Sequence, residues 1–240
     1  MNKRTLEECK EQLQRSDKNT LERRAERLKE LEVIHTDARL FSSQKEWDYA
    51  SEASDSYING NYRSVIFCCA CAVDQIFKYE YLKLPESSYH DIKRCTFGRI
   101  IRKCRDKGTA SLIPYIEKAE LLNQMRNEVS AHPLFIDLPV DSNPESTMRN
   151  TLLLEDIKKL IKLVENIDPE LKTEIEATKL ISQVEERTFI FGEVIAQRSE
   201  MPFNLDGFWG LIENDILKYL ANQAWHTMKI IAEGLYGVSS

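Results

Sequence analysis

The stretch 62-YRSVIFCCACAVDQIFKYEYLKL-84 is the most apolar segment of this 240-residue chain. Its apolar residues recur near the period of an α-helix, at Val65, Ile66, Cys69, Val73, Ile76, Phe77 and Leu84. A strong turn signal, Asn59-Gly60, precedes the stretch and Pro85 follows it, which predicts a helix bounded at both ends. We therefore expect residues 62 to 84 to form the central helix of the core.

The segments on both sides of this stretch also favour helices. Gly is scarce at 8 residues and Pro at 7, and no alternating Val, Ile and Thr segment lies between turn signals. Further helices are expected at about 44 to 58, 93 to 107, 114 to 132, 151 to 166, 169 to 198 and 209 to 231. The sequence predicts an all-α fold.

We expect three parts along the chain. Residues 1–41 form a charged helical arm, whose helix is expected to start at a capping box made by Asn19 and Glu22. Residues 42–168 form a helical bundle. Residues 169–240 form a C-terminal helical hairpin that packs on the bundle or beside it, starting at Asp168-Pro169.

Charge is distributed unevenly over the sequence. The net charge is −6 and the pI about 5.4, which argues against a protein that coats nucleic acid over its whole surface. Residues 93 to 107 nevertheless carry seven cations against the single carboxylate of Asp106. This segment is either a solvated helix face or a local phosphate-binding surface, and Arg99, Arg102 and Lys103 are the candidate RNA-binding residues.

Cysteines and apolar runs limit the other classes of function. The longest apolar run, residues 65 to 73, is far shorter than the roughly 20 residues of a membrane span. The start of the chain lacks the apolar core of a signal peptide, so we expect a cytoplasmic protein with no membrane contact. Its six cysteines are then expected to be reduced and mostly buried. A metal site at Cys68, Cys71 and His90 is a distant alternative, and no cofactor is expected.

The segment 123-NQMRNEVSAHPLF-135 carries the candidate reactive residues Arg126, Asn127 and His132. On a continuous helix, Arg126 and His132 would point about 120° apart and lie about 9 Å apart along the axis. Pro133 disfavours the helical conformation for the residue before it. His132 can therefore leave the helix and turn back toward Arg126 or toward a second chain.

This motif, Arg-x5-His at the end of a late amphipathic helix, resembles that of HEPN domains. Residues 56 to 64 (SYINGNYRS), the apolar helix after them and 97-FGRII-101 are also similar to segments of that family. The resemblance covers about residues 44 to 166. It implies a helical bundle and a metal-independent ribonuclease that acts as a homodimer, with two copies of the motif facing one cleft. Such proteins act in toxin–antitoxin or antiviral systems, often with an antitoxin or another regulatory protein partner.

The residue types suit this chemistry. The unperturbed pKa of histidine, about 6.5, allows proton transfer near neutral pH, and the guanidinium of arginine binds phosphate through two hydrogen bonds. Asn127 is expected to be an orienting group or a phosphate-contacting group, and Asp74, an acid within the apolar helix, is expected to support Arg126 or His132. Some toxin members carry a modifiable Tyr two residues after the His, where this chain has Leu134.

Two alternatives remain open at this point. In a purely structural interpretation, Arg126 pairs with Glu52, Asp55 or Asp74, and His132 interacts with the helix dipole. In the other, the chain is a non-catalytic helical module that binds a nucleotide or a partner protein.

Overall fold

The computed structural model of the chain describes residues 6–32, 41–131 and 205–237, together with the single positions 159, 162 and 182. All regular structure in these ranges is helical and none of it is strand, which confirms the all-α prediction. None of the helices that these residues form has an apolar stretch long enough to cross a bilayer.

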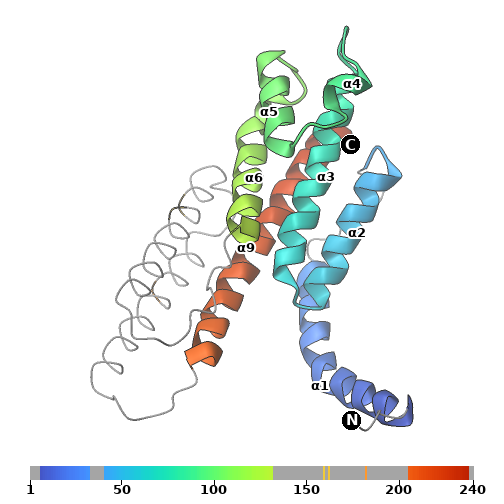
Figure 1. Ribbon diagram of the computed structural model, residues 1–240, viewed down its shortest axis with the longest axis vertical. Helices are drawn as coiled ribbons and strands as arrows, with labels where there is room; N and C mark the ends of the chain where they lie inside the picture. Colours follow the sequence, from blue (N-terminus) through green and yellow to red (C-terminus); the bar gives the residue numbers. More distant parts are fainter. Residues whose placement is uncertain are drawn as a thin grey trace.

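Four long helices run along one another and form the body of the molecule (Figure 1). They are α2 (Gln44–Ile58), α3 (Tyr62–Leu82), α6 (Ile116–Ala131) and α9 (Leu205–Tyr236). The short helices α4 (Tyr89–Ile92) and α5 (Phe97–Asp106) lie at one end, and α1 (Leu6–Glu32) projects from the other. A 3₁₀ turn, η2 (Ile113–Tyr115), leads into α6 and has Pro114 in its first positions, as expected where no backbone N–H is needed.

The helix α3 lies at the centre and packs against α2, α5, α6 and α9. The predicted stripe is fully buried from Val65 to Phe77, and burial extends to Cys68, Ala70 and Ala72 on other sides of the helix. Small Ala and Cys side chains let neighbouring helices approach closely. The helix is therefore buried over most of its circumference, as the sequence predicts for a core helix.

Gly60 and Arg27 fix the turn between α2 and α3, while Ser43 fixes the opposite end of α2. Ser43 caps α2 by accepting a hydrogen bond from the backbone N–H of Glu46. Gly60 has a φ of +76°, a backbone conformation that residues with a Cβ atom rarely adopt. The Arg27 guanidinium of α1 packs against Gly60 and donates to the carbonyl of Ile58 at 3.1 Å. This turn therefore also anchors the C-terminal half of α1.

The predicted start of the first helix is wrong. The helix α1 begins at Leu6, so Asn19 and Glu22 lie inside it and form no capping box. The segment from Leu6 contains mainly Glu, Lys, Gln, Arg and Leu, which propagate helices well, and an interior Asn costs less than about 1 kcal/mol. A capping signal without a helix breaker before it does not start a new helix.

The helix α9 belongs to the same core as α2, α3 and α6. Leu220, Ala224 and Met228 are fully buried, and Trp225 is buried as well. Near its end, Gly234 provides the space for the Tyr115 side chain, whose hydroxyl lies where a Cβ would be. The first half of the predicted hairpin, residues 169 to 198, lies outside the described residues apart from position 182, and so does the predicted boundary at residue 168.

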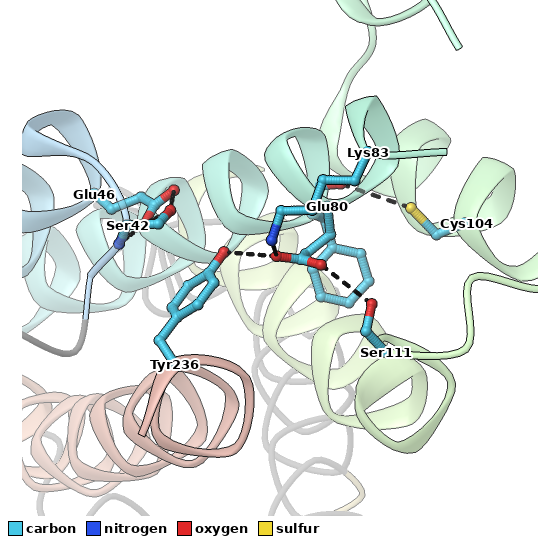
Figure 2. A network of polar contacts seen from close by, with 8 residues as sticks. Ser42, Glu46, Glu80, Lys83, Cys104, Ser111 and Tyr236 are labelled. Carbon is cyan, nitrogen blue, oxygen red and sulfur yellow. Dashed lines mark hydrogen bonds and ion pairs between the residues drawn. The ribbon is translucent and has the colours of Figure 1, made fainter. Parts of the chain in front are cut away.

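A buried carboxylate connects three parts of the fold where α3 and α9 both end. Glu80 is 5% exposed and accepts hydrogen bonds from Ser111 at 3.2 Å and Tyr236 at 3.1 Å, besides an ion pair with Lys83 (Figure 2). Burial raises the pKa of Tyr236, so its hydroxyl keeps its proton and remains a donor. Glu80 thus joins α3 to the entry of α6 and to the end of α9.

A second buried acid lies beside this group. Glu46 is 1% exposed and accepts from the backbone N–H of Ser42 at 3.0 Å and from the Ser42 hydroxyl. Besides burial, the charges of Glu46 and Glu80 both raise the pKa of Tyr236, so this second acid lies near the same phenol. Since each carboxylate has several donors, the cost of burying it is largely offset.

We expect Glu80→Ala to lower the free energy of unfolding by on the order of 1–3 kcal/mol, because it removes the buried carboxylate that accepts hydrogen bonds from the hydroxyls of Ser111 and Tyr236. Urea unfolding followed by circular dichroism measures the change. Glu26→Ala, at an exposed position of α1, is the matched control. Equal stability of the two variants would contradict this role of Glu80.

Candidate nucleotide-binding pocket

A pocket of about 350 Å³ opens where α3 begins and α6 ends. Its lining residues come from three helices, with Glu52 from α2, Arg126 and Val129 from α6, and Arg63, Ser64, Ile66, Phe67 and Cys68 from α3. The lining combines two guanidiniums and a carboxylate with apolar walls. The first turn of α3, which carries Arg63 and Ser64, adds the partial positive charge of a helix N-terminus. The pocket is therefore suited to an anion attached to an apolar group.

Arg126 is the predicted site residue that the structure places at this pocket. Its guanidinium carbon lies 5.9 Å from the ring centre of Phe97, and Nη2 donates to Oδ1 of Asn127 at 3.0 Å. Arg126 and Asn127 are therefore joined by a hydrogen bond, and the role of Asn127 toward a phosphate stays a prediction. Within the described residues Arg126 forms no ion pair with a carboxylate, so the pairing with Glu52, Asp55 or Asp74 that the structural alternative requires is not formed.

Arg63 is a residue of this site that the sequence did not single out. It comes from the first turn of α3 and donates from Nη1 to the carbonyl of Val129 at 3.1 Å. That carbonyl belongs to the last turn of α6, where helix carbonyls lack partners within the helix. Arg63 thereby fixes the end of α6, one turn before His132. Burial lowers its pKa, yet a guanidinium stays charged at neutral pH.

Asp74 is bonded within its own helix. It accepts from Lys78 at 2.6 Å, and one of its oxygens, Oδ1, is buried and has no hydrogen bond. Burial raises its pKa, and the charges of Lys78 and Arg126 partly offset this effect. Asp74 therefore acts on Arg126 through electrostatics, without a direct bond, and its predicted support of His132 falls outside the described residues.

The helix α5, which carries the predicted basic surface, has its first residue near the pocket and its last turn near the other end of α3. Phe97, the first residue of α5, contacts Arg126, whereas Lys103, near the other end of the helix, lies 5.7 Å from the ring centre of Tyr81. Arg99 and Arg102 are exposed, and Arg102 donates to the carbonyl of Gly98. Lys103 therefore lies next to the end of α3 where Glu80 is buried, away from the pocket at its beginning.

Three cysteines, Cys68, Cys69 and Cys104, are placed as small core residues, whereas Cys71 and Cys95 are half-buried. Cys69 and Cys104 are fully buried, and no group of three or more His, Cys, Asp or Glu side chains in the described ranges could hold a metal ion. Burial raises the pKa of the Cys68 and Cys104 thiols to about 12 and that of Cys69 well above its ordinary value. Since thiolates bind metals and react, these thiols are poor ligands and poor nucleophiles.

His132, Pro133 and Leu134 lie outside the described residues, so the convergence of His132 with Arg126 stays a prediction.

Phe67, like Arg63, is a pocket residue that the sequence did not single out. Both lie on the side of α3 that faces α2 and the end of α6, and a single sequence does not reveal which helices pack on that side. The contrast of Phe67, 52% exposed, with the buried residues around it is visible only after folding.

Comparison of the chain with family models, with curated proteins and with solved structures gives no match. The chain is therefore an all-helical domain without a family assignment, and the resemblance to HEPN domains stays a prediction.

We expect Cys69 and Cys104 to resist a thiol reagent such as 5,5′-dithiobis(2-nitrobenzoate) at pH 8 in the native protein. A thiol with a pKa of about 12, as for Cys104, has on the order of a thousand times less thiolate at this pH than an ordinary cysteine. Peptide mass spectrometry locates the labels, with the urea-unfolded chain as control. Equal labelling of Cys104 in both states would contradict the burial described.

Proposed function

We propose that the chain is a metal-independent endoribonuclease of HEPN type that cleaves RNA by attack of the RNA's own 2′-hydroxyl. The observation that carries the proposal is the presence of two guanidiniums, those of Arg63 and Arg126, at one pocket at the end of the motif helix. This helix reaches Ala131, so the next residue along the chain is His132. A phosphate held in the pocket would lie beside the end of α6, the helix that His132 follows in sequence.

The chemistry divides between two residue types. A guanidinium neutralises the charge that develops on the phosphate oxygens during attack, and the imidazole of His132 transfers the proton near neutral pH. Asn127 holds Arg126 in place through their 3.0 Å hydrogen bond. The exposed Arg99 and Arg102 on α5 then guide the RNA strand by its charge.

The active form in this proposal is a homodimer in which the motif of a second chain faces the first across one cleft. In the sequence, one histidine, His132, directly follows α6, whereas an acid and a base acting together require two proton-transfer groups. A second chain would supply the other group. The cytoplasmic setting that we propose is toxin–antitoxin or antiviral defence, in which a regulatory protein restrains the enzyme.

The second candidate is a non-catalytic module that binds a nucleotide or a partner protein. The same pocket favours it, because charged and apolar walls bind a nucleotide with or without subsequent chemistry. The two candidates differ in one respect, which is the cleavage of RNA.

We expect the purified protein to cleave RNA in EDTA and to leave 2′,3′-cyclic phosphate ends. Arg126→Ala and His132→Ala should each lower the rate by about 100-fold or more, because one removes phosphate stabilisation and the other proton transfer. Labelled RNA on denaturing gels measures the rate, and Arg23→Ala, at an exposed arginine of α1, is the control. Full activity of both variants would exclude the proposed mechanism.

A binding experiment tests the pocket separately from the chemistry. An RNA with 2′-O-methyl groups lacks the nucleophile, so the protein binds it without cleaving it. The slope of log Kobs against log salt concentration should fall by about 0.7 in Arg63→Gln, since one phosphate contact to a single strand is lost. Fluorescence anisotropy gives the slopes, with Arg23→Gln as control. An unchanged slope for Arg63→Gln would show that Arg63 binds no phosphate.

A further inference from the structure

Phe67 differs from the other large apolar residues in the first half of α3. Val65, Ile66 and Cys69 are fully buried, whereas the Phe67 ring is 52% exposed and lines the pocket that contains Arg63 and Arg126. A fully buried ring of this size would stabilise the fold by about 1 kcal/mol or more over one that is half in water. An aromatic surface beside two cations requires an explanation that core packing does not supply.

The chemistry of the lining specifies what the pocket holds. Arg63, Arg126 and the Ser64 hydroxyl provide hydrogen-bond donors for an anion, and Phe67 provides a flat apolar surface. Glu52 adds one carboxylate to the same lining, which disfavours multiply charged anions and leaves one net positive charge. A phosphodiester carries a single negative charge, and the base attached to it is flat. One nucleotide unit of a single strand therefore fits these groups better than free phosphate or a nucleoside triphosphate.

We propose that Phe67 is a stacking platform for one RNA base, with the adjoining phosphate bound by Arg63 and Arg126. The proposal rests on the proposed function for the choice of RNA as the ligand. Stacking on an aromatic ring tolerates all four bases, because each has a π face. The platform therefore places any nucleotide beside the end of α6, and sequence preference, where it exists, arises from other contacts.

The test uses fluorescein-labelled 2′-O-methyl pentanucleotides of A, C, G and U and fluorescence anisotropy with the 240-residue protein. We expect Phe67→Ala to weaken binding about 10-fold for each probe, the size of effect typical of one lost stacking contact. Phe67→Leu should weaken binding similarly because it keeps apolar volume without a ring, whereas Phe67→Trp should retain it. Probe should also quench the additional fluorescence of the Phe67→Trp variant relative to wild type.

Tyr79→Ala is the matched control, since Tyr79 is also an exposed aromatic residue of α3, at 43%, and does not line the pocket. Thermal melts confirm that each variant is folded. Equal affinities for wild type and Phe67→Ala would overturn the proposal, as would failure of wild type to bind any probe. A change in sedimentation from dimer to monomer in Phe67→Ala and Phe67→Leu, with unchanged affinity per chain, would assign Phe67 to the subunit contact and overturn it too.

The two proposals fail in different ways. If RNA binding depends on Phe67 but unmodified RNA is not cleaved, the stacking role of Phe67 is supported and the nuclease activity is excluded. If cleavage depends on Arg126 and His132 but Phe67→Ala binds RNA as wild type does, the nuclease activity is supported and the stacking role of Phe67 is excluded.

Discussion

The burial of α3 is the constraint on which the rest of this structure depends. An apolar helix that cannot face water needs neighbours on nearly every side, and here α2, α5, α6 and α9 provide them. The last of these comes from the far end of the chain, so a helix more than 120 positions away in sequence belongs to the same core. Polar residues of α3 are then tolerated only where a partner reaches them.

The two ends of α3 satisfy this requirement in different ways. At its C-terminal end, Glu80 is surrounded by donors from two other segments and from Lys83, the residue that caps α3, and the result is a closed polar group (Figure 2). At its N-terminal end, Arg63 caps the last turn of α6 while its surroundings stay open as a pocket. The closed end holds the helices together, and the open end carries charge, an exposed ring and access from solvent. This difference explains why the candidate site lies where α3 begins.

Local patterns predicted much of the helical core. The apolar stripe of α3 is buried as expected from Val65 to Phe77, since a period of 3.6 places those residues on one face and burial of that face stabilises the helix. The bounds of α2 agree because Gly60 stops the helix and Ser43 caps it. Tertiary polar contacts were not predicted, because Glu80, Ser111 and Tyr236 are far apart in sequence and no periodicity links them. Similarly, Arg126 and Asn127 could be selected from their motif, whereas Arg63 and Phe67 depend on which helices pack against α3.

The most direct test is a crystal structure of the chain bound to a 2′-O-methyl RNA dinucleotide. The phosphodiester should lie within hydrogen-bonding distance of the guanidiniums of Arg63 and Arg126, with a base on Phe67 and His132 beside the phosphate. A dinucleotide bound on another surface, with the pocket of Arg63 and Arg126 empty, would contradict the account.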